Sequence, residues 1–287
     1  MNQILRFLPA LRVHSWGGFG SQLFTAYVVI KIQKQFPNRR IKVVIHTSGV
    51  TRRVSEFDFE TLGVKVIQVE DFKGTESQNT VQKIPSHYSS NLSKMLKRLL
   101  LQVFSWTRLV QSADTDLSFN LISLWTISLR GHYTRLALDE SIVQSLYQAV
   151  FPRETQCMTN GRELVVHYRL GDLLNLDEKQ PISIERVDRI LETISAHLSQ
   201  PVLLSDSKGA DLATFLEHST ILKFSTPLNF CPNETLRICI DADNFVGTGA
   251  KISLWAAIFR YYIYQKESFL PRELDWSISL GLKSNWY

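Results

Sequence analysis

Strand-like and helix-like segments alternate along the second half of this chain, and this alternation limits its fold more than any other feature. The strand-like runs are ELVVHYRL (163–170), PVLLSD (201–206) and NFVGTG (244–249). The helix-like runs between and after them are 182–198, 208–218, 236–242 and 251–264. Parallel strands need crossover connections of this kind, which are usually helical. We therefore expect a parallel sheet covered by helices over residues 161–265, a Rossmann-like domain.

The first half has the same α/β character. A glycine-rich turn at 17–20 leads into a stretch with apolar residues at helical spacing (21–36), and two β-branched runs follow at 41–46 and 63–70. A polar segment at 152–163 has the composition of a linker. We predict an N-terminal α/β domain (1–152), a C-terminal domain (161–265) and a last segment (266–287) that packs back across the domains, with a ligand cleft between two facing domains.

Composition excludes several classes of protein. The 287 residues carry a net charge of +5 with 27 acidic residues, too little for a dedicated nucleic-acid binder. Three cysteines without a CxxC pair disfavour both a disulfide framework and a structural zinc site. No apolar run approaches the roughly 18 residues of a membrane span, and the N-terminus lacks the pattern of a signal peptide. We expect a cytoplasmic protein.

Residues 92–110 are predicted to form an amphipathic helix. Its apolar stripe and its cationic border consist of Leu92, Met95, Leu96, Leu99, Val103, Trp106 and Val110, and of Lys94, Lys97, Arg98 and Arg108. Two interpretations remain open: a surface helix packed on its own domain, or an interfacial helix that contacts anionic lipid at the inner face of the plasma membrane.

Polar residues follow three strand-like runs of the second half. His167-Tyr168-Arg169-Leu170-Gly171-Asp172, Ser205-Asp206-Ser207 and the turn 247–253 stand at these strand ends. Ligands of open α/β sheets bind beyond the carboxyl ends of the strands. A glycine turn that opens a helix offers free N–H groups to an anion, and Lys251 and Arg169 add cationic charge. The set predicts a nucleoside diphosphate site, although GTGAK lacks the P-loop pattern.

Four motifs resemble those of the bacterial α-1,2-fucosyltransferases, a family 11-like group within the α-1,2/α-1,6/O-fucosyltransferase superfamily. GGFGSQLFTAY (17–27) is similar to GGLGNQMFQYA, and HYRLGD (167–172) is similar to HxRRGD. LLSDS (203–207) resembles FSDD, and GAKISLWAAIF (249–259) resembles NSSFSWWAAWL. The motifs occur in the family's order and cover nearly the whole chain, and the terminal NWY is similar to the family's C-terminal asparagine-tryptophan.

This resemblance implies a GT-B architecture of two Rossmann-like domains. It also implies metal-independent, inverting transfer of L-fucose or a related 6-deoxyhexose from a GDP-sugar to a glycan hydroxyl, without a cofactor. By the same resemblance Arg169 grips the donor β-phosphate, His167 contacts guanine, and Asp206 contacts guanine or ribose. The phosphate turn comprises Gly249, Ala250, Lys251, Ile252 and Ser253. Gly18, Gly20 and Gln22 match the opening that faces the gap between donor and acceptor.

Some positions depart from the family pattern. The second arginine of HxRRGD is Leu170, and we hypothesise that Lys251 restores the missing charge. Ser21 replaces the asparagine of GNQ. We expect Ser21 and His14 on the acceptor side, and HST (46–48) and GHYTR (131–135) are candidate segments of the acceptor pocket.

Inverting transfer needs a base that takes the proton of the attacking hydroxyl. Asp177 lies ten residues after His167, a spacing similar to that of the acidic base in related α-1,6-fucosyltransferases, and Glu178 and Asp172 are rivals. His14, just before the glycine turn, is a weaker candidate.

The sequence thus favours an α-1,2-type fucosyltransferase of O-antigen or other surface-polysaccharide synthesis, with a lipid-linked acceptor among its possible partners and no nucleic acid. Two alternatives stay open: the same fold with another nucleotide-sugar, and a non-catalytic nucleotide-binding relative.

Overall fold

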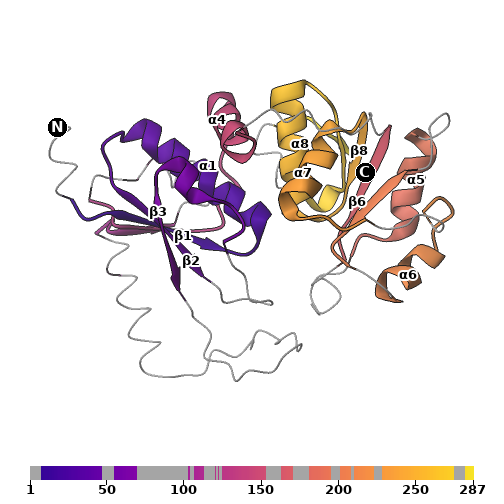
Figure 1. Ribbon diagram of the computed structural model, residues 1–287, viewed down its shortest axis with the longest axis horizontal. Coiled ribbons are helices and arrows are strands. Elements are labelled where there is room, and N and C mark those ends of the chain that lie inside the picture. Colours follow the sequence, from indigo (N-terminus) through magenta and orange to yellow (C-terminus); the bar gives the residue numbers. More distant parts are fainter. Residues whose placement is uncertain are drawn as a thin grey trace, which may run out of the picture. The chain divides into compact units, whose positions relative to one another are not determined.

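A computed structural model describes residues 8–46, 55–69, 103, 107–112, 120, 122, 125–152, 163–170, 181–194, 201–207, 210–222, 228–274 and 282–287. The chain divides into two compact units, Met1–Ala149 (unit 1) and Val150–Tyr287 (unit 2). Each unit holds a five-stranded sheet whose described strand pairs are all parallel (Figure 1). The α/β class with two parallel-sheet domains is therefore confirmed. The facing of the domains across a cleft stays a prediction.

Unit 1 is built around a central strand, β1. Its elements are β1 (Leu11–Trp16), α1 (Phe19–Gln35), β2 (Ile41–His46), the 3₁₀ helix η2 (Phe59–Leu62), β3 (Lys65–Val69), β4 (Val110–Ser112), β5 (Ser128–Arg130) and α4 (Glu140–Val150). The strand order β3-β2-β1-β5-β4 puts β1 in the centre, and α1 lies along one face of the sheet (Figure 1). Because α1 is buried on most sides from Phe19 to Ile32, it is a core helix rather than a surface helix.

Unit 2 has the order β10-β9-β8-β6-β7. Its elements are β6 (Leu164–Tyr168), α5 (Ile184–Ile194), β7 (Val202–Ser205), α6 (Ala210–Glu217), α7 (Pro232–Asp241), β8 (Asn244–Gly247), α8 (Lys251–Tyr264), β9 (Phe269–Leu270) and β10 (Asn285–Trp286). In Figure 1, α5 and α6 cover one face of the sheet and α7 and α8 the other. Strands β9 and β10 extend this same sheet, and the packing of 266–287 across both domains stays a prediction.

One apolar cluster explains how the α5–α6 side of unit 2 packs. It joins Val166 and Tyr168 of β6 to Val187 and Leu191 of α5, and it also includes Leu170. The five side chains are fully buried, at 0% exposure. At about 25 cal/mol per Å² of apolar surface, such clusters supply most of the driving force for folding.

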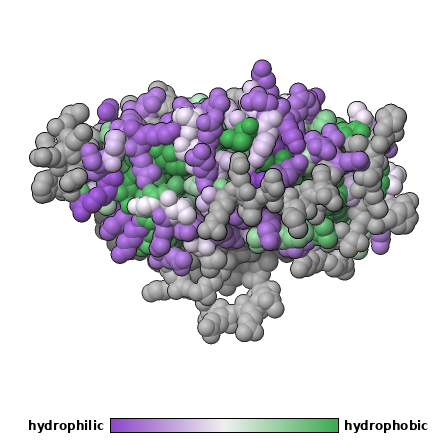
Figure 2. Space-filling model, turned by 45° about the horizontal axis from the view of Figure 1, so that its top comes forward, coloured by the Kyte–Doolittle hydropathy of each residue, from purple (hydrophilic) through white to green (hydrophobic). Residues whose placement is uncertain are grey.

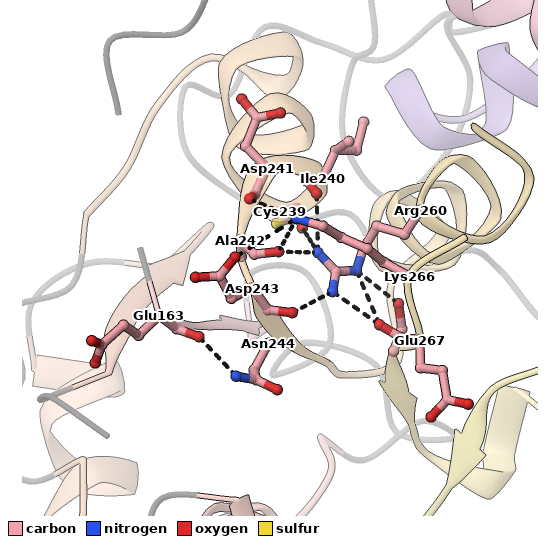
Figure 3. A network of polar contacts seen from close by, with 11 residues as sticks. Glu163, Cys239, Ile240, Asp241, Ala242, Asp243, Asn244, Arg260, Lys266 and Glu267 are labelled. Atoms are coloured by element: carbon pink, nitrogen blue, oxygen red, sulfur yellow. Dashed lines mark hydrogen bonds and ion pairs between the residues drawn. The ribbon is translucent and has the colours of Figure 1, made fainter. Parts of the chain in front are cut away.

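A buried arginine fixes the ends of α7 and α8 on the other side of the sheet. Arg260, fully buried in α8, donates to the carbonyl oxygens of Ile240 (3.0 Å), Ala242, Asp243 (2.9 Å) and Glu267 (Figure 3). Burial lowers its pKa to about 10, which leaves the guanidinium charged at neutral pH. The arginine therefore satisfies carbonyls at a helix end that would otherwise be buried without donors.

The predicted helix 92–110 lies mostly outside the described residues. Val103 is helical and 41% exposed, whereas Val110, the last residue of the predicted helix, is the first residue of β4. Polar side chains cover most of the described surface in the view of Figure 2, with apolar patches between them. Within the residues that the structure describes, no helix has the length and apolar character needed to cross a bilayer.

Candidate functional site

Three adjacent strand ends form the candidate site of unit 2. β6 lies between β7 and β8, with Tyr168 opposite Ser205 and His167 opposite Gly247. All three strands are parallel, so their carboxyl ends meet at one edge of the sheet. At this edge an α/β domain binds its ligand.

Side chains of the loops after β7 and β8 hold the loop after β6 in place. The amide of Arg169 donates to Oγ1 of Thr248 (2.9 Å), and the amide of Leu170 donates to Oδ1 of Asp206 (3.0 Å). Thr248, which is 1% exposed, also donates from its amide to the carbonyl of His167 (3.1 Å). The three loops therefore form one hydrogen-bonded rim. Within this rim Asp206 remains exposed to solvent.

Leu170 occupies the position of the second motif arginine. Its side chain is fully buried in the apolar cluster, and its amide binds Asp206. Residue 170 therefore contributes only its backbone to the rim. The arginine of the motif at this strand end is Arg169, which is half-buried.

His167 is a buried, neutral group. Its imidazole is 4% exposed, and Nδ1 lies 2.7 Å from the hydroxyl of Ser253. Burial lowers the pKa of His167 to about 4, an effect that Arg169 strengthens and Asp206 opposes. The imidazole thus joins β6 to the first turn of α8 as a hydrogen-bonding group without charge at neutral pH.

The glycine turn between β8 and α8 is tightly packed at one glycine and open at the other. A Cβ on Gly247 would lie 2.6 Å from Cβ of Ser253 and 3.0 Å from Cδ2 of Leu270, whereas a Cβ on Gly249 would meet nothing within 4 Å. The hydroxyl of Tyr287 donates to the carbonyl of Gly247 (3.0 Å). The start of the turn is thus fixed by packing, and its later part has space beside it.

The first turn of α8 has the character of an anion site. Its N-cap is Ala250, whose methyl group cannot accept a hydrogen bond, and the first turn carries no acidic residue. The first N–H groups of a helix lack acceptors within the helix, and the helix dipole makes this end positive. Lys251, the first helical residue, adds a full positive charge. An anionic ligand complements all three features.

The other glycine turn of the chain, before α1, is closed by protein groups. Gly17 has φ +93°, and the amide of Phe19 donates to the carboxylate of Glu56. A carboxylate at this position already satisfies the helix terminus. The first turn of α1 is therefore met by the carboxylate of Glu56, whereas the first turn of α8 contains no acidic residue of its own.

Gln22 also belongs to this closed turn. It is fully buried, its Nε2 donates to the carbonyl of Gly17 (3.3 Å), and its Oε1 accepts from the amides of Glu56 (2.8 Å) and Phe57 (2.9 Å). The amide therefore positions the turn. The N-cap of α1 is Gly18, and Gly20 and Ser21 lie in its first turn. Donor or acceptor contacts by these four residues stay predictions.

His14, inside β1, lies in a second polar cluster on the unit 1 sheet, in which Trp16 and His46 are the last residues of β1 and β2. Its Nδ1 is 2.7 Å from Nε2 of His46, and its Nε2 is 3.1 Å from Oγ of Ser128. The rings of Trp16 and His46 stack with centroids 4.5 Å apart and an interplanar angle of 7°. On Trp16 also lies the guanidinium of Arg130, 5.2 Å from the ring centroid.

The predicted base candidates Asp172, Asp177 and Glu178 lie outside the described residues. Among the described residues, no group of three or more histidine, cysteine, aspartate or glutamate side chains is arranged to hold a metal ion. Metal independence stays a prediction from the resemblance.

Two polar side chains at these turns and clusters were not predicted from the sequence. Glu56 and Ser128 carry no local motif, and each meets its partner across a large sequence separation, 37 residues to Phe19 and 114 residues to His14. The pairing of β1 with β2 and β5 brings Ser128 and His46 beside His14. This proximity cannot be predicted from a local sequence pattern.

No family model matches the chain, and no curated protein sequence matches it. Among solved structures, a glycosyl transferase of family 9 from Veillonella parvula aligns over 92% of this chain and 81% of its own, with 10% identity and a TM-score of 0.42. A co-structure of S. aureus MnaA with UDP covers 91% and 78%, with 9% identity and a TM-score of 0.43. A sialyltransferase from Photobacterium damsela covers 97% and 81%, with 10% identity and a TM-score of 0.33. Because all three TM-scores lie below 0.5, these similarities do not decide the function.

Proposed function

We propose that this protein is a glycosyltransferase that holds a nucleoside diphosphate sugar at the carboxyl edge of the unit 2 sheet. One observation carries the proposal. The strand ends of β6, β7 and β8 bring Arg169, Asp206 and the acid-free first turn of α8 to one hydrogen-bonded rim. A diphosphate needs fixed positive charge, and a sugar or base needs acceptors such as an exposed carboxylate.

The leaving group is the part of the reaction that this rim serves best. When the glycosidic bond to the donor breaks, negative charge grows on the departing diphosphate. Arg169, Lys251 and the positive end of α8 stabilise that charge more strongly in the transition state than in the ground state. His167 is neutral, so it positions the first turn of α8 through Ser253 without adding a charge to the phosphate site.

The resemblance supplies the finer proposal. It favours GDP-fucose or a related GDP-6-deoxyhexose as donor and a glycan hydroxyl as acceptor, with inversion and an α-1,2 linkage. The acceptor is then a surface polysaccharide, carried on a lipid at the inner face of the plasma membrane. The alternatives are a different nucleotide-sugar in the same site and a relative that binds the nucleotide without transfer.

Titration calorimetry with GDP, UDP, dTDP and CMP, without added metal, tests the site and the base together. We expect selective GDP binding that Arg169→Ala and Lys251→Ala weaken, because each removes a cation from the phosphate. Selective binding of another nucleotide would replace the donor and keep the site. If no nucleotide binds to the folded protein, the proposal is wrong.

A matched pair of substitutions at Ala250 isolates the anion site. Ala250→Ser and Ala250→Asp both supply an N-cap acceptor, which typically stabilises a helix by about 1 kcal/mol. Only the aspartate adds negative charge where the phosphate is proposed to bind. We expect at least a roughly tenfold loss of GDP affinity for Ala250→Asp and a much smaller change for Ala250→Ser. Equal GDP affinities of the two variants would show that the phosphate does not bind at this turn.

A further inference from the structure

Exposed apolar side chains gather at one place in unit 1, the edge of the sheet where its strands begin. Among the described residues, the large hydrophobic side chains that are exposed are Val103 (41%), Trp125 (67%), Ile127 (37%) and Tyr264 (40%). Of these only Tyr264 belongs to unit 2. Trp125 and Ile127 directly precede β5, and Val103 precedes β4. Scattered exposed apolar residues are ordinary, whereas a cluster of them marks a surface that contacts something else.

Backbone hydrogen bonds show that four strand starts lie side by side. The amide of Ile127 donates to the carbonyl of Leu109 (2.8 Å), and the amide of Arg12 donates to the carbonyl of Ile127 (2.9 Å). The amide of Leu11 in turn donates to the carbonyl of Arg40 (2.9 Å). The starts of β4, β5, β1 and β2 therefore follow one another along the edge, over about 15 Å at the usual spacing of strands.

Three exposed arginines stand at the same strand starts. Arg40 precedes β2, Arg12 lies in β1, and Arg108 precedes β4. Within the part of the chain that the structure describes, none of the three forms an ion pair, and Arg40 donates to the carbonyl of Leu8 (2.9 Å). Arg108 has φ 58°, in the left-handed region, and follows the turn that begins at Val103. Uncompensated positive charge thus borders the exposed apolar side chains.

A buried arginine fixes this edge and adds charge behind it. Arg39, which is 7% exposed, donates from Nη2 to the carbonyl of Thr126 (2.8 Å). Oγ1 of Thr126 donates to the carbonyl of Arg108 (3.0 Å), so the start of β2 is tied to the starts of β5 and β4. The buried Nη1 of Arg39 has no hydrogen-bond partner among the described residues. Its positive charge therefore adds to that of the exposed arginines.

We name these exposed cationic and apolar residues the amino edge of unit 1: Arg12, Arg40, Val103, Arg108, Trp125 and Ile127. We propose that the amino edge binds the surface of an anionic lipid bilayer. Arginine heads attract acidic lipid headgroups while the apolar stems pack in the interface. Tryptophan is enriched at the depth of the headgroups, and aliphatic side chains contact the acyl chains. The inference does not depend on the nucleotide site of unit 2.

The strand register favours a broad, flat partner. Arg12 pairs with Ser128, so Arg12 and Ile127 point to opposite faces of the sheet. A partner that contacts both must meet the edge end-on, as a bilayer does. Aliphatic side chains such as Ile127 find a partner in acyl chains but none in a nucleic-acid backbone. Exposed Asp58 and Glu60 lie beside the start of β3, so we expect contact only from β2 through β1 and β5 to β4.

Vesicle flotation of the whole protein tests the charge of the amino edge. We expect tighter binding to vesicles of phosphatidylcholine with phosphatidylserine than to phosphatidylcholine alone, and a loss of binding at high salt. Each basic residue near an anionic surface raises binding about fivefold. Arg12→Gln, Arg40→Gln and Arg108→Gln combined in one protein should therefore weaken binding roughly 100-fold.

A matched control removes the same charge from unit 2. It combines Arg189→Gln, Arg272→Gln and Lys283→Gln, three exposed positions, and should bind vesicles nearly as tightly as the wild type. Equal losses in the two triple variants would show that binding follows net charge alone, which would overturn the proposal.

Trp125 tests whether apolar side chains enter the interface. Brominated lipids quench a tryptophan that enters the bilayer, and the difference between the wild type and Trp125→Phe isolates Trp125 among the six tryptophans of the chain. We expect this difference to show quenching of Trp125. Trp125→Ala should weaken vesicle binding severalfold, whereas Tyr264→Ala, which removes an exposed ring of unit 2, should not. Vesicle binding without quenching of Trp125 would contradict the proposal.

Other occupants of the amino edge give different results. A dimer that Trp125→Ala converts to a monomer, with vesicle binding unchanged, would make the edge an interface between two copies of the chain. Binding of duplex DNA that the arginine variant loses, without vesicle binding, would assign the edge to nucleic acid. Either result overturns the proposal. GDP binding is measured separately in unit 2, so the proposed function stands or fails independently of these outcomes.

Discussion

At the scale of single residues, the environment changes what a residue type does. Arg169 and Leu170 are neighbours in one motif, yet the first stays half-buried at the rim and the second is fully buried in the core. Gln22, whose contact with the donor stays a prediction, holds the backbone of its own turn and of 56–57 through its side-chain amide. Burial and hydrogen-bond partners, rather than motif membership, decide which side chains remain available.

His167 carries a pH dependence that can be measured. Its pKa falls from 6.5 to about 4 on folding, so between these values the unfolded chain binds more protons than the folded one. Stability therefore decreases as the pH falls from 6.5 towards 4, by at most about 1.4 kcal/mol per pH unit from this group. We expect His167→Asn, which can still meet Ser253 but does not titrate, to show a shallower fall.

Urea unfolding at several pH values between 4 and 7 makes this comparison. Other groups contribute equally to both proteins, so only the difference between the two curves reports His167. Parallel curves would show that the imidazole is not buried in its neutral form.

At the scale of elements, helix ends determine both stability and the site. α1 receives Glu56 at its start, α7 receives Arg260 at its end, and the first turn of α8 contains no acidic residue of its own. These ends differ because the helix dipole favours an acid at the N-terminus and a cation at the C-terminus. Where a buried helix N-terminus has no acidic residue, a ligand is the natural complement.

Arg260→Met tests the importance of the α7 end. The substitution keeps an apolar stem but leaves several buried carbonyls without their donor, including those of Ile240 and Ala242. Each unsatisfied buried group costs about 1–3 kcal/mol, so we expect a loss of at least about 3 kcal/mol. The exposed Arg272 provides the control, because Arg272→Met should stay within about 0.5 kcal/mol of the wild type.

The loss of stability in each variant is measured from its denaturant unfolding midpoint. A loss for Arg260→Met no larger than that for Arg272→Met would mean that solvent replaces the arginine at the end of α7.

At the scale of the whole molecule, two units of the same class have different polar edges. The rim of unit 2 offers cations, an exposed carboxylate and an open glycine turn, whereas the edge of unit 1 offers paired imidazoles and stacked aromatic rings. The first set suits an anionic ligand.

Hydrogen exchange with and without GDP tests where the proposed nucleotide binds. We expect GDP to slow exchange in unit 2 at amides after β6, β7 and β8, especially 248–253, because bound phosphate occupies or shields them. The strands β1 and β2 should change little. Protection confined to unit 1 would show that GDP binds there, which contradicts the proposed site in unit 2.

By itself, the sequence determined the α/β class, the parallel character of the second sheet and most of its elements. Periodicity is a local property, so α8, β6 and the turn between β8 and α8 could be predicted from their own residues. The central strand β1 was not predicted, because His14 and Ser15 interrupt its apolar run. It is a strand because β2 and β5 pair with it on both sides.

Only the tertiary structure decided which polar groups meet. Glu56 reaches α1, Arg260 reaches the end of α7, and Ser128 reaches His14 through contacts between segments distant in sequence. The free energy of such a contact depends on burial and on the partner's position, and neither is present in a local pattern. The sequence therefore indicated where strands end, and the fold decided which polar groups meet there.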